Sequence, residues 1–313
     1  MDDFASATML RLLLRAMAAH GLAPPLPQPD AARVPLQHKQ QAVACIVHAG
    51  GLPLLLQLAQ QIQHIDGEPL HHALVGARDP HDFLARWQRL ERYVHLSHRV
   101  RCLAQDALGL TLEHTSTRGA PPLAAESVAV LGAWIGALQA IGCRGLRVAV
   151  GDQVVHGDGA TSAWAAGSAD RWQLRWLGTD PASATVPRGA PGASLPAMPP
   201  LESPLPWPQP AADLARWMAH DLAAAHRVAD AAAALGLSLR TLQRRLADAG
   251  TSYRSLLGEV RVRQAAICLA RPGTTLAEIG FLCGFADQAH FTREFTRRAG
   301  LPPACYRGAA TAR

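Results

Sequence analysis

Apolar residues recur at helical spacing in the first 178 residues and then give way to shorter alternating runs. The helical pattern covers residues 9–17, 43–47, 54–62, 83–96 and 128–141. Strand patterns fall at residues 100–104, 108–114, 146–150 and 172–177. Several helices therefore precede any sheet, and the pattern predicts an α+β domain over residues 1–178.

The pattern breaks down between residues 179 and 210, where proline, alanine, glycine and serine dominate. Ten prolines fall in this stretch. Because proline fixes φ and has no backbone N–H to donate, such a segment forms neither a helix interior nor a central strand, and it favours an extended spacer. We therefore expect a Pro-rich linker over residues 179–210 between two separable domains.

Residues 211–313 return to helical spacing, interrupted at short intervals by glycine and without a strand pattern. Two stretches share one plan of helix, turn and helix: residues 228–249 around Gly236-Leu237-Ser238, and residues 276–299 around Gly284-Phe285-Ala286. Each has a small residue, Ala232 or Gly280, four positions before the turn glycine, which lets two helices cross closely. The spacing predicts an all-α domain with two helix-turn-helix units.

The side chains that follow each turn suit contact with DNA. The predicted contacts are Ser238, Arg240, Thr241 and Arg244 from the first helix-turn-helix unit and Gln288, His290, Thr292 and Arg293 from the second helix-turn-helix unit. Ser238 and Asp287 are placed to cap the two helices. Apolar residues occupy the opposite, core-facing side: Leu242, Leu246, Phe291 and Phe295. Arginine can donate two hydrogen bonds to guanine, and glutamine can pair with adenine.

Composition and charge agree with a DNA-binding module. Hydrophobic residues make up 49% of the 313 residues and charged residues 17%, which excludes wholesale disorder. The net charge of +6 belongs to the last third, since residues 211–313 hold 14 arginines against 8 acidic residues, whereas residues 1–210 hold 16 basic and 16 acidic residues. A positive charge confined to one domain is typical of polyanion binding, although a solvated basic face would look the same.

A longer pattern surrounds the two turns. It comprises Gly236-Leu237-Ser238 with Arg240, Leu242 and Arg244, then Gly250-Thr251-Ser252-Tyr253, Arg261, Arg263 and Ala265, the run from Ile279 to Phe295, Gly300-Leu301-Pro302-Pro303 and Tyr306-Arg307. With this pattern, residues 228–307 resemble the DNA-binding domain of the AraC/XylS family of bacterial transcriptional regulators. Leu246 and Ala289 depart from the family, which usually has phenylalanine and serine there.

The resemblance implies a seven-helix domain. In that family a connecting helix, here residues 253–269, holds two recognition helices for successive major grooves on one face of DNA. Successive grooves are about 34 Å apart, so a rigid connector fixes the spacing of the half-sites.

The first domain is similar, over a shorter pattern, to the arabinose-binding-type effector domain of some AraC/XylS proteins. The similarity rests on Asp79-Pro80, on Trp87-Gln88-Arg89-Leu90 and on the strand pair around residues 99–115. It implies a module that senses a small molecule or dimerises. Because aromatic side chains can line an apolar pocket, Trp87, Trp134 and Trp172 are the candidate effector contacts.

No constellation of catalytic or metal-binding residues stands out. The six cysteines form no C-x-x-C pair, and neither a nucleophile elbow nor a P-loop is present. We therefore expect no enzymatic activity, no cofactor and no metal. The best apolar stretch, residues 128–142, is too short to span a membrane and reads as a buried amphipathic helix, and the acidic N-terminus is unlike a secretory signal. The expected location is the cytoplasm.

These features predict a sequence-specific transcriptional regulator that responds to a small-molecule effector through residues 1–178. Its expected partners are double-stranded promoter DNA and the effector; RNA polymerase and a second copy of the chain are further candidates. The alternative is a ligand-independent regulator whose N-terminal domain only dimerises or contacts a protein partner. An enzyme fused to a DNA-binding domain would need a convergent catalytic site, which the sequence does not display. Activation and repression stay open.

Overall fold

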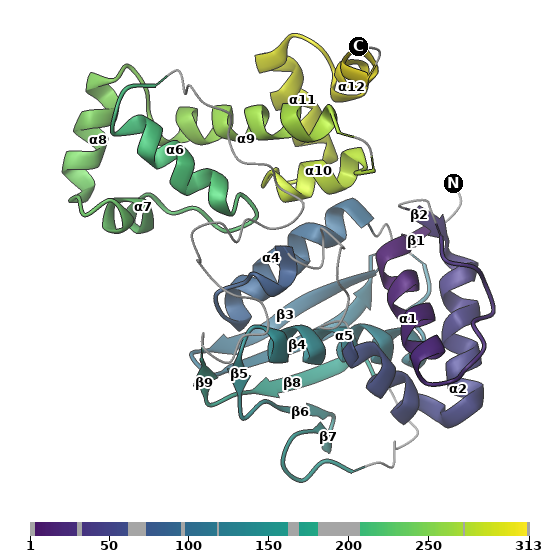
Figure 1. Ribbon diagram of the computed structural model, residues 1–313. Coiled ribbons are helices and arrows are strands. Elements are labelled where there is room, and N and C mark those ends of the chain that lie inside the picture. Colours follow the sequence, from purple (N-terminus) through teal and green to yellow (C-terminus); the bar gives the residue numbers. More distant parts are fainter. Residues whose placement is uncertain are drawn as a thin grey trace. The chain divides into compact units, whose positions relative to one another are not determined.

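The computed structural model describes residues 4–29, 33–61, 73–94, 98–117, 119–161, 169–180, 207–271 and 273–311. The chain divides into two compact units, Met1–Ala190 and Pro191–Arg313 (Figure 1). Most of the predicted linker, residues 181–206, lies outside the described residues, so the linker stays a prediction.

The first unit combines helices with antiparallel strands. In chain order its elements are β1 (Phe4–Ser6), α1 (Ala7–Ala19), β2 (Arg33–Pro35), α2 (Leu36–Ala59), α4 (Pro80–Val94), β3 (His98–Asp106), β4 (Gly109–Ser116), α5 (Ala124–Ala140), β5 (Cys143–Arg144), β6 (Arg147–Val150), β7 (Gln153–His156), β8 (Arg171–Arg175) and β9 (Gly178–Thr179). The predicted helices and all four predicted strands are confirmed within the described residues, but the stretches 43–47 and 54–62 belong to the single helix α2, and residues 62 and 95–96 lie outside the described residues. The expectation that several helices precede any sheet is wrong, because β1 precedes α1 and pairs with β2. The remaining strands have only two to four residues, too few for an alternating pattern to be recognised.

Five of these strands form one antiparallel sheet in the order β3-β4-β8-β6-β7. Leu112 of β4 is paired with Trp172 of β8, and both side chains are buried, as alternate residues on the core face of a sheet should be. Trp134 of α5 lies against Trp172, with ring centroids 6.5 Å apart. The core of the unit therefore lies between the sheet and α5.

Helix α5 is buried along almost its whole length and on every side. It was expected to be amphipathic, and that expectation is wrong because α2 also covers it. A Cβ at Gly132 would lie 2.6 Å from the Ala59 Cβ and 2.8 Å from the Leu56 carbonyl oxygen. The absence of a side chain at Gly132 thus sets how closely α5 and α2 approach.

Among the described helices, α2 alone is long and apolar enough, by length and composition, to cross a membrane. Its length and apolar character were not predicted from the sequence, in which residues 128–142 were taken as the best apolar stretch. The helix is kinked, because Gly50 and Gly51 leave the helical region with φ of −160° and +71° and Pro53 follows. A core helix passes the same length test, and α2 packs against α1 and α5.

The described part of the second unit, residues 207–271 and 273–311, contains seven helices and no strand. They are α6 (Ala211–His220), α7 (Val228–Ala234), α8 (Leu239–Asp248), α9 (Tyr253–Leu269), α10 (Leu276–Leu282), α11 (Gln288–Ala299) and α12 (Pro303–Thr311). The predicted all-helical domain is confirmed. Helix α9 contacts α6, α10, α11 and α12, so it is the central element of this unit.

The turn between α7 and α8 uses a left-handed glycine. Gly236 has φ of +64°, its N–H donates to the Ala233 carbonyl at 3.0 Å, and the Leu237 N–H donates to the Ala232 carbonyl at 2.9 Å. This pair of bonds is the Schellman arrangement, which satisfies the last carbonyls of a helix.

The turn between α10 and α11 repeats that arrangement in a more crowded place. Gly284 has φ of +77°, and its N–H donates to the Phe281 carbonyl at 3.0 Å. A Cβ at Gly284 would collide with the carbonyl oxygen of Leu222, whereas nothing lies within 4 Å of one at Gly236. Both turns need glycine for φ, but only the second also needs it for space.

Alanine substitution at the two glycines should therefore distinguish the cost of a positive φ from the cost of a steric clash. We expect Gly236→Ala to lower the free energy of unfolding of the second unit by about 1–2 kcal/mol, the cost of a left-handed residue with a Cβ. Gly284→Ala adds the clash with the Leu222 carbonyl and should cost about 3 kcal/mol or more. Urea titration followed by far-UV circular dichroism measures both losses. Equal losses would contradict the packing described at Gly284.

A buried carboxylate joins α4 to β3 in the first unit. Glu91 is 4% exposed and accepts hydrogen bonds from Trp87 Nε1 at 2.7 Å and from the Val100 N–H at 3.0 Å. Burial raises the pKa of Glu91 from 4.5 to about 7, although both hydrogen bonds favour the charged form.

This raised pKa gives stability a defined pH dependence. Below about pH 4.5 the carboxyl is protonated in both states, and between pH 4.5 and about 7 the unfolded state loses its proton first, so stability falls as pH rises. Glu91→Gln removes that slope. The variant should therefore gain up to about 3 kcal/mol over the wild type between pH 4.5 and pH 8. Urea unfolding of both proteins at the two pH values, followed by tryptophan fluorescence, tests this; parallel pH profiles would refute it.

Candidate nucleic-acid interface

The start of α8 is held by a local cap. Ser238 Oγ accepts a hydrogen bond from the Thr241 N–H at 3.1 Å and lies 2.8 Å from Thr241 Oγ1. Leu242 and Leu246 are fully buried on the inner side of the helix. Because the cap fixes where α8 begins and the leucines fix its rotation, the outward residues are determined.

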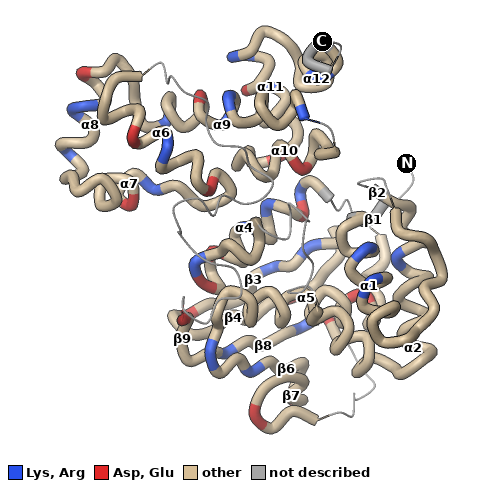
Figure 2. Tube along the Cα trace, viewed as in Figure 1, with Lys and Arg blue, Asp and Glu red and all other residues tan. Residues whose placement is uncertain are grey.

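The outward side of α8 carries four exposed residues at helical spacing, Arg240, Gln243, Arg244 and Ala247, which we call the α8 face. None of the described residues forms an ion pair with Arg240 or Arg244, and Figure 2 marks the arginines on this helix. Both arginines were among the contacts predicted from the sequence, but Gln243 was not. The same three- and four-residue spacing that selected the arginines could have found it.

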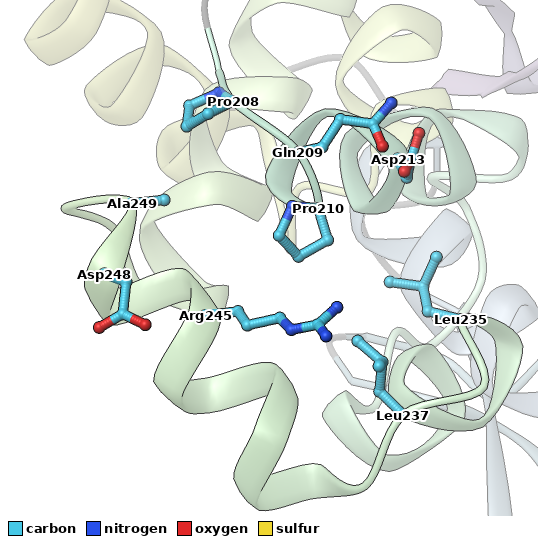
Figure 3. Close-up of a pocket in the computed structure, with 9 residues that line it drawn as sticks. All are labelled: Pro208, Gln209, Pro210, Asp213, Leu235, Leu237, Arg245, Asp248 and Ala249. Carbon is cyan, nitrogen blue, oxygen red and sulfur yellow. The ribbon is translucent and has the colours of Figure 1, made fainter.

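The neighbouring Arg245 belongs to a different surface. A cavity of about 560 Å³ lies beside α8, and Figure 3 shows the Arg245 guanidinium directed into it between Pro210 and the two leucines Leu235 and Leu237. The carboxylate of Asp248 points away from that guanidinium in the same view. Arg245 is therefore not part of the α8 face, although it follows Arg244 directly in the sequence.

The start of α11 is built on the same principle with different side chains. Asp287 Oδ1 accepts from the His290 N–H at 2.7 Å, which confirms Asp287 as the cap. His290 Nδ1 accepts from the Ala286 N–H at 3.1 Å, and its ring lies edge-on to Phe285 with centroids 5.5 Å apart. The imidazole of His290 thus also supports the turn.

One exposed arginine of α11 is free of local carboxylates. Arg297 and Arg298 both pair with Glu294, at 2.7 Å and 3.4 Å. Hydrogen bonding from Arg297 holds the pKa of the Glu294 carboxyl below its usual value. Arg293 is exposed and forms no ion pair with any described residue. Its charge is therefore available to a phosphate or a base edge.

Helix α9 lies between the two helix-turn-helix motifs and sets the distance between α8 and α11. It has 17 residues and so is about 25 Å long. Figure 1 places α8 near one end of α9 and α11 near the other. The bounds of α9, Tyr253–Leu269, coincide with the connecting helix implied by the family resemblance.

The eight predicted DNA contacts therefore fall into two groups. Arg240, Arg244 and Arg293 are exposed and make no ion pair with described residues. The other five have local roles or partial burial: Ser238 and Thr241 form the α8 cap, His290 supports a turn, Thr292 Oγ1 donates to the Gln288 carbonyl at 3.0 Å, and Gln288 itself is half-buried. Contact of any of them with DNA stays a prediction.

The three candidate effector residues of the first unit lie together. Trp87, Trp134 and Trp172 are each at most 5% exposed, and Trp134 lies between the other two with ring centroids 5.6 Å and 6.5 Å away. They form an aromatic cluster inside the core. Their contact with an effector stays a prediction.

The similarity to known proteins lies in the second unit. A family model described as "Helix-turn-helix domain" matches residues 231–309. Over 77 residues the chain is 39% identical to an uncharacterized HTH-type transcriptional regulator of Mycobacterium tuberculosis, and over 79 residues it is 40% identical to the ornithine utilization regulator of Pseudomonas aeruginosa. Each match covers 25% of this chain, with 22% of the first relative and 23% of the second. The chain thus spans less than a quarter of the length of these relatives.

The crystal structure of a DNA-binding transcriptional dual regulator from Escherichia coli is 23% identical, with a TM-score of 0.33, and the match covers 36% of this chain and 100% of that chain. The Mycobacterium and Escherichia proteins are named as transcriptional regulators, and the Pseudomonas protein is named as a regulator.

The matched residues contain α8, α9, α10 and α11, and so include both turns and the helix between them. The family model does not reach the first unit, whose likeness to the arabinose-binding type stays a prediction. The second unit is an AraC/XylS-type helix-turn-helix domain, the DNA-binding module of a family of transcription regulators rather than of enzymes.

Proposed function

We propose that the whole protein is a sequence-specific transcription regulator that binds promoter DNA in the cytoplasm. The observation that carries the proposal is the pairing of two exposed, arginine-bearing helix faces with one connecting helix. Each face is fixed from behind by buried apolar residues, and each recognition helix is capped at its N-terminus.

The electrostatics of the two faces support contact with DNA. A cation that already pairs with a carboxylate would have to give up that pair to bind a phosphate, but Arg240, Arg244 and Arg293 have no such partner among the described residues. Arginine can also donate two hydrogen bonds to guanine in the major groove, and the exposed Gln243 can pair with adenine. Side chains on the two faces can therefore both bind phosphates of the DNA backbone and form hydrogen bonds with base edges.

The first unit is proposed to sense a small molecule and to bias DNA binding. Support for this role comes from the buried tryptophan cluster and from the buried polar and charged side chains of the same unit. An effector can shift DNA affinity only by its different affinities for the two conformations or assemblies that it connects. The alternative is a unit that only dimerises or contacts a protein such as RNA polymerase.

Alanine substitution tests the two faces. Arg240→Ala and Arg293→Ala should each weaken binding to a genomic site by about 1–3 kcal/mol and relax preference at particular base pairs. Arg216→Ala is the matched control, because Arg216 is exposed on α6 but already pairs with Asp213 at 2.8 Å. Fluorescence anisotropy at fixed salt, on the genomic site and on a scrambled duplex, measures each effect. Equal weakening on both duplexes would indicate that these arginines contact phosphates and not bases.

Effector response needs a separate measurement on the full chain. Addition of a cognate small molecule should change DNA affinity or promoter output, and it should also raise the melting temperature of the first unit. A library that leaves melting, affinity and output unchanged would favour the ligand-independent alternative. Size-exclusion chromatography at several concentrations then shows whether the first unit dimerises.

A further inference from the structure

The cavity of about 560 Å³ beside α8 lies within the second unit and outside the α8 face. Three segments line it: the start of α6 with the residues before it, the turn between α7 and α8, and the last turns of α8. Its volume falls within the range of roughly 300–1,000 Å³ that small-molecule sites have. The cavity is therefore large enough for a small ligand, and it is formed by one unit alone.

Apolar side chains form part of its wall. Leu235 and Leu237 flank the turn glycine Gly236, and Figure 3 shows Pro210 on the other side of the Arg245 guanidinium. The two leucines and Pro210 are partly exposed, so their apolar surface is in contact with water. A ligand with an apolar body would remove that surface from water, which favours binding.

The guanidinium of Arg245 is directed into this cavity (Figure 3). The side chain is exposed, and it forms no hydrogen bond or ion pair with any residue that the structure describes. A guanidinium is planar, and its paired N–H donors match the two oxygens of a carboxylate. Its donors are therefore available to a ligand that supplies acceptors.

Two carboxylates also line the cavity and limit the charge of a ligand. Asp213 Oδ1 already pairs with Arg216 at 2.8 Å, and the carboxylate of Asp248 points away from Arg245. The first turn of α6 and the last turn of α8 both border the cavity, and the two helix ends have dipoles of opposite sign. One negative charge can therefore pair with Arg245, whereas a second would face two aspartates without a cation.

We propose that this cavity, the Arg245 cavity, binds a small organic monocarboxylate with an apolar body. The carboxylate accepts two hydrogen bonds from the guanidinium, and the apolar body lies against Leu235, Leu237 and Pro210. Because the two leucines flank the turn that leads into α8, the ligand adds contacts between that turn, α6 and α8. The site belongs to the second unit, so it does not rest on the sensing role proposed for the first.

Isothermal titration calorimetry on the full chain, without DNA, tests the site. The probes are sodium octanoate and sodium 4-phenylbutyrate. The references are 4-phenylbutanamide, which keeps the apolar body without the charge, and sodium phosphate at equal ionic strength, which has the charge without the apolar body. At least one of the two carboxylates should bind at one molecule per chain, and both references should bind at least about tenfold more weakly.

Substitution of Arg245 locates the bound carboxylate. Arg245→Gln should weaken binding by about tenfold or more, because the hydrogen bonds from a charged donor are lost. Since Arg245 is exposed, the variant should keep the far-UV circular dichroism spectrum of the wild type. Arg254→Gln is the matched control and should bind like the wild type. Arg254 is also exposed, pairs with no described carboxylate and does not line the cavity.

Four results would overturn the proposal. Neither carboxylate binds the wild type, or the amide binds as tightly as its acid. Arg245→Gln keeps the affinity of the wild type, which would place the ligand elsewhere in the chain. Phosphate binds as tightly as the carboxylates, which would make Arg245 a general phosphate contact. DNA binding by the α8 face is measured separately with Arg240→Ala, so failure of this site leaves the proposed function intact.

Discussion

The DNA-binding unit depends on the burial of one apolar ridge behind each recognition helix. Leu242 and Leu246 behind α8, and Phe291 and Phe295 behind α11, are at most 1% exposed. A helix held by two buried residues one turn apart cannot rotate without exposing them, so the same packing that stabilises the unit selects which arginines face outward. The stability of this unit and the outward orientation of these arginines therefore come from the same contacts.

Local sequence rules predicted this unit well because its helices are determined by neighbours in the chain. Ser238 and Asp287 were identified as caps from their position before a helical pattern, and both accept the expected backbone hydrogen bond. The same rules missed Gln243 and gave His290 no structural role, since the ring of His290 is held by the Ala286 N–H and by Phe285 in the preceding turn. Side-chain contacts across a turn depend on packing that periodicity does not encode.

The first unit was less predictable because much of its order is nonlocal. The burial of α5 on every side depends on its contacts with α2 at Gly132 and with the sheet at Trp172, and these elements lie far apart in the sequence. The buried charges were not predicted either, because burial of a single polar residue leaves no periodic signal. Sequence patterns thus identified the strands and helices here, but not the polar core between them.

The buried charges of the first unit differ in how far their hydrogen bonds and ion pairs compensate their burial. Arg86 is 1% exposed, yet it donates to Asp82 Oδ2 at 3.0 Å and to the Ala73 carbonyl at 2.6 Å, so its burial is compensated within the fold. Lys39 is 4% exposed, and no described residue forms a salt bridge or hydrogen bond with its ammonium group. Burial of a cation that no described group compensates by a hydrogen bond or ion pair costs stability, whereas the pairing of Arg86 with Asp82 offsets that cost.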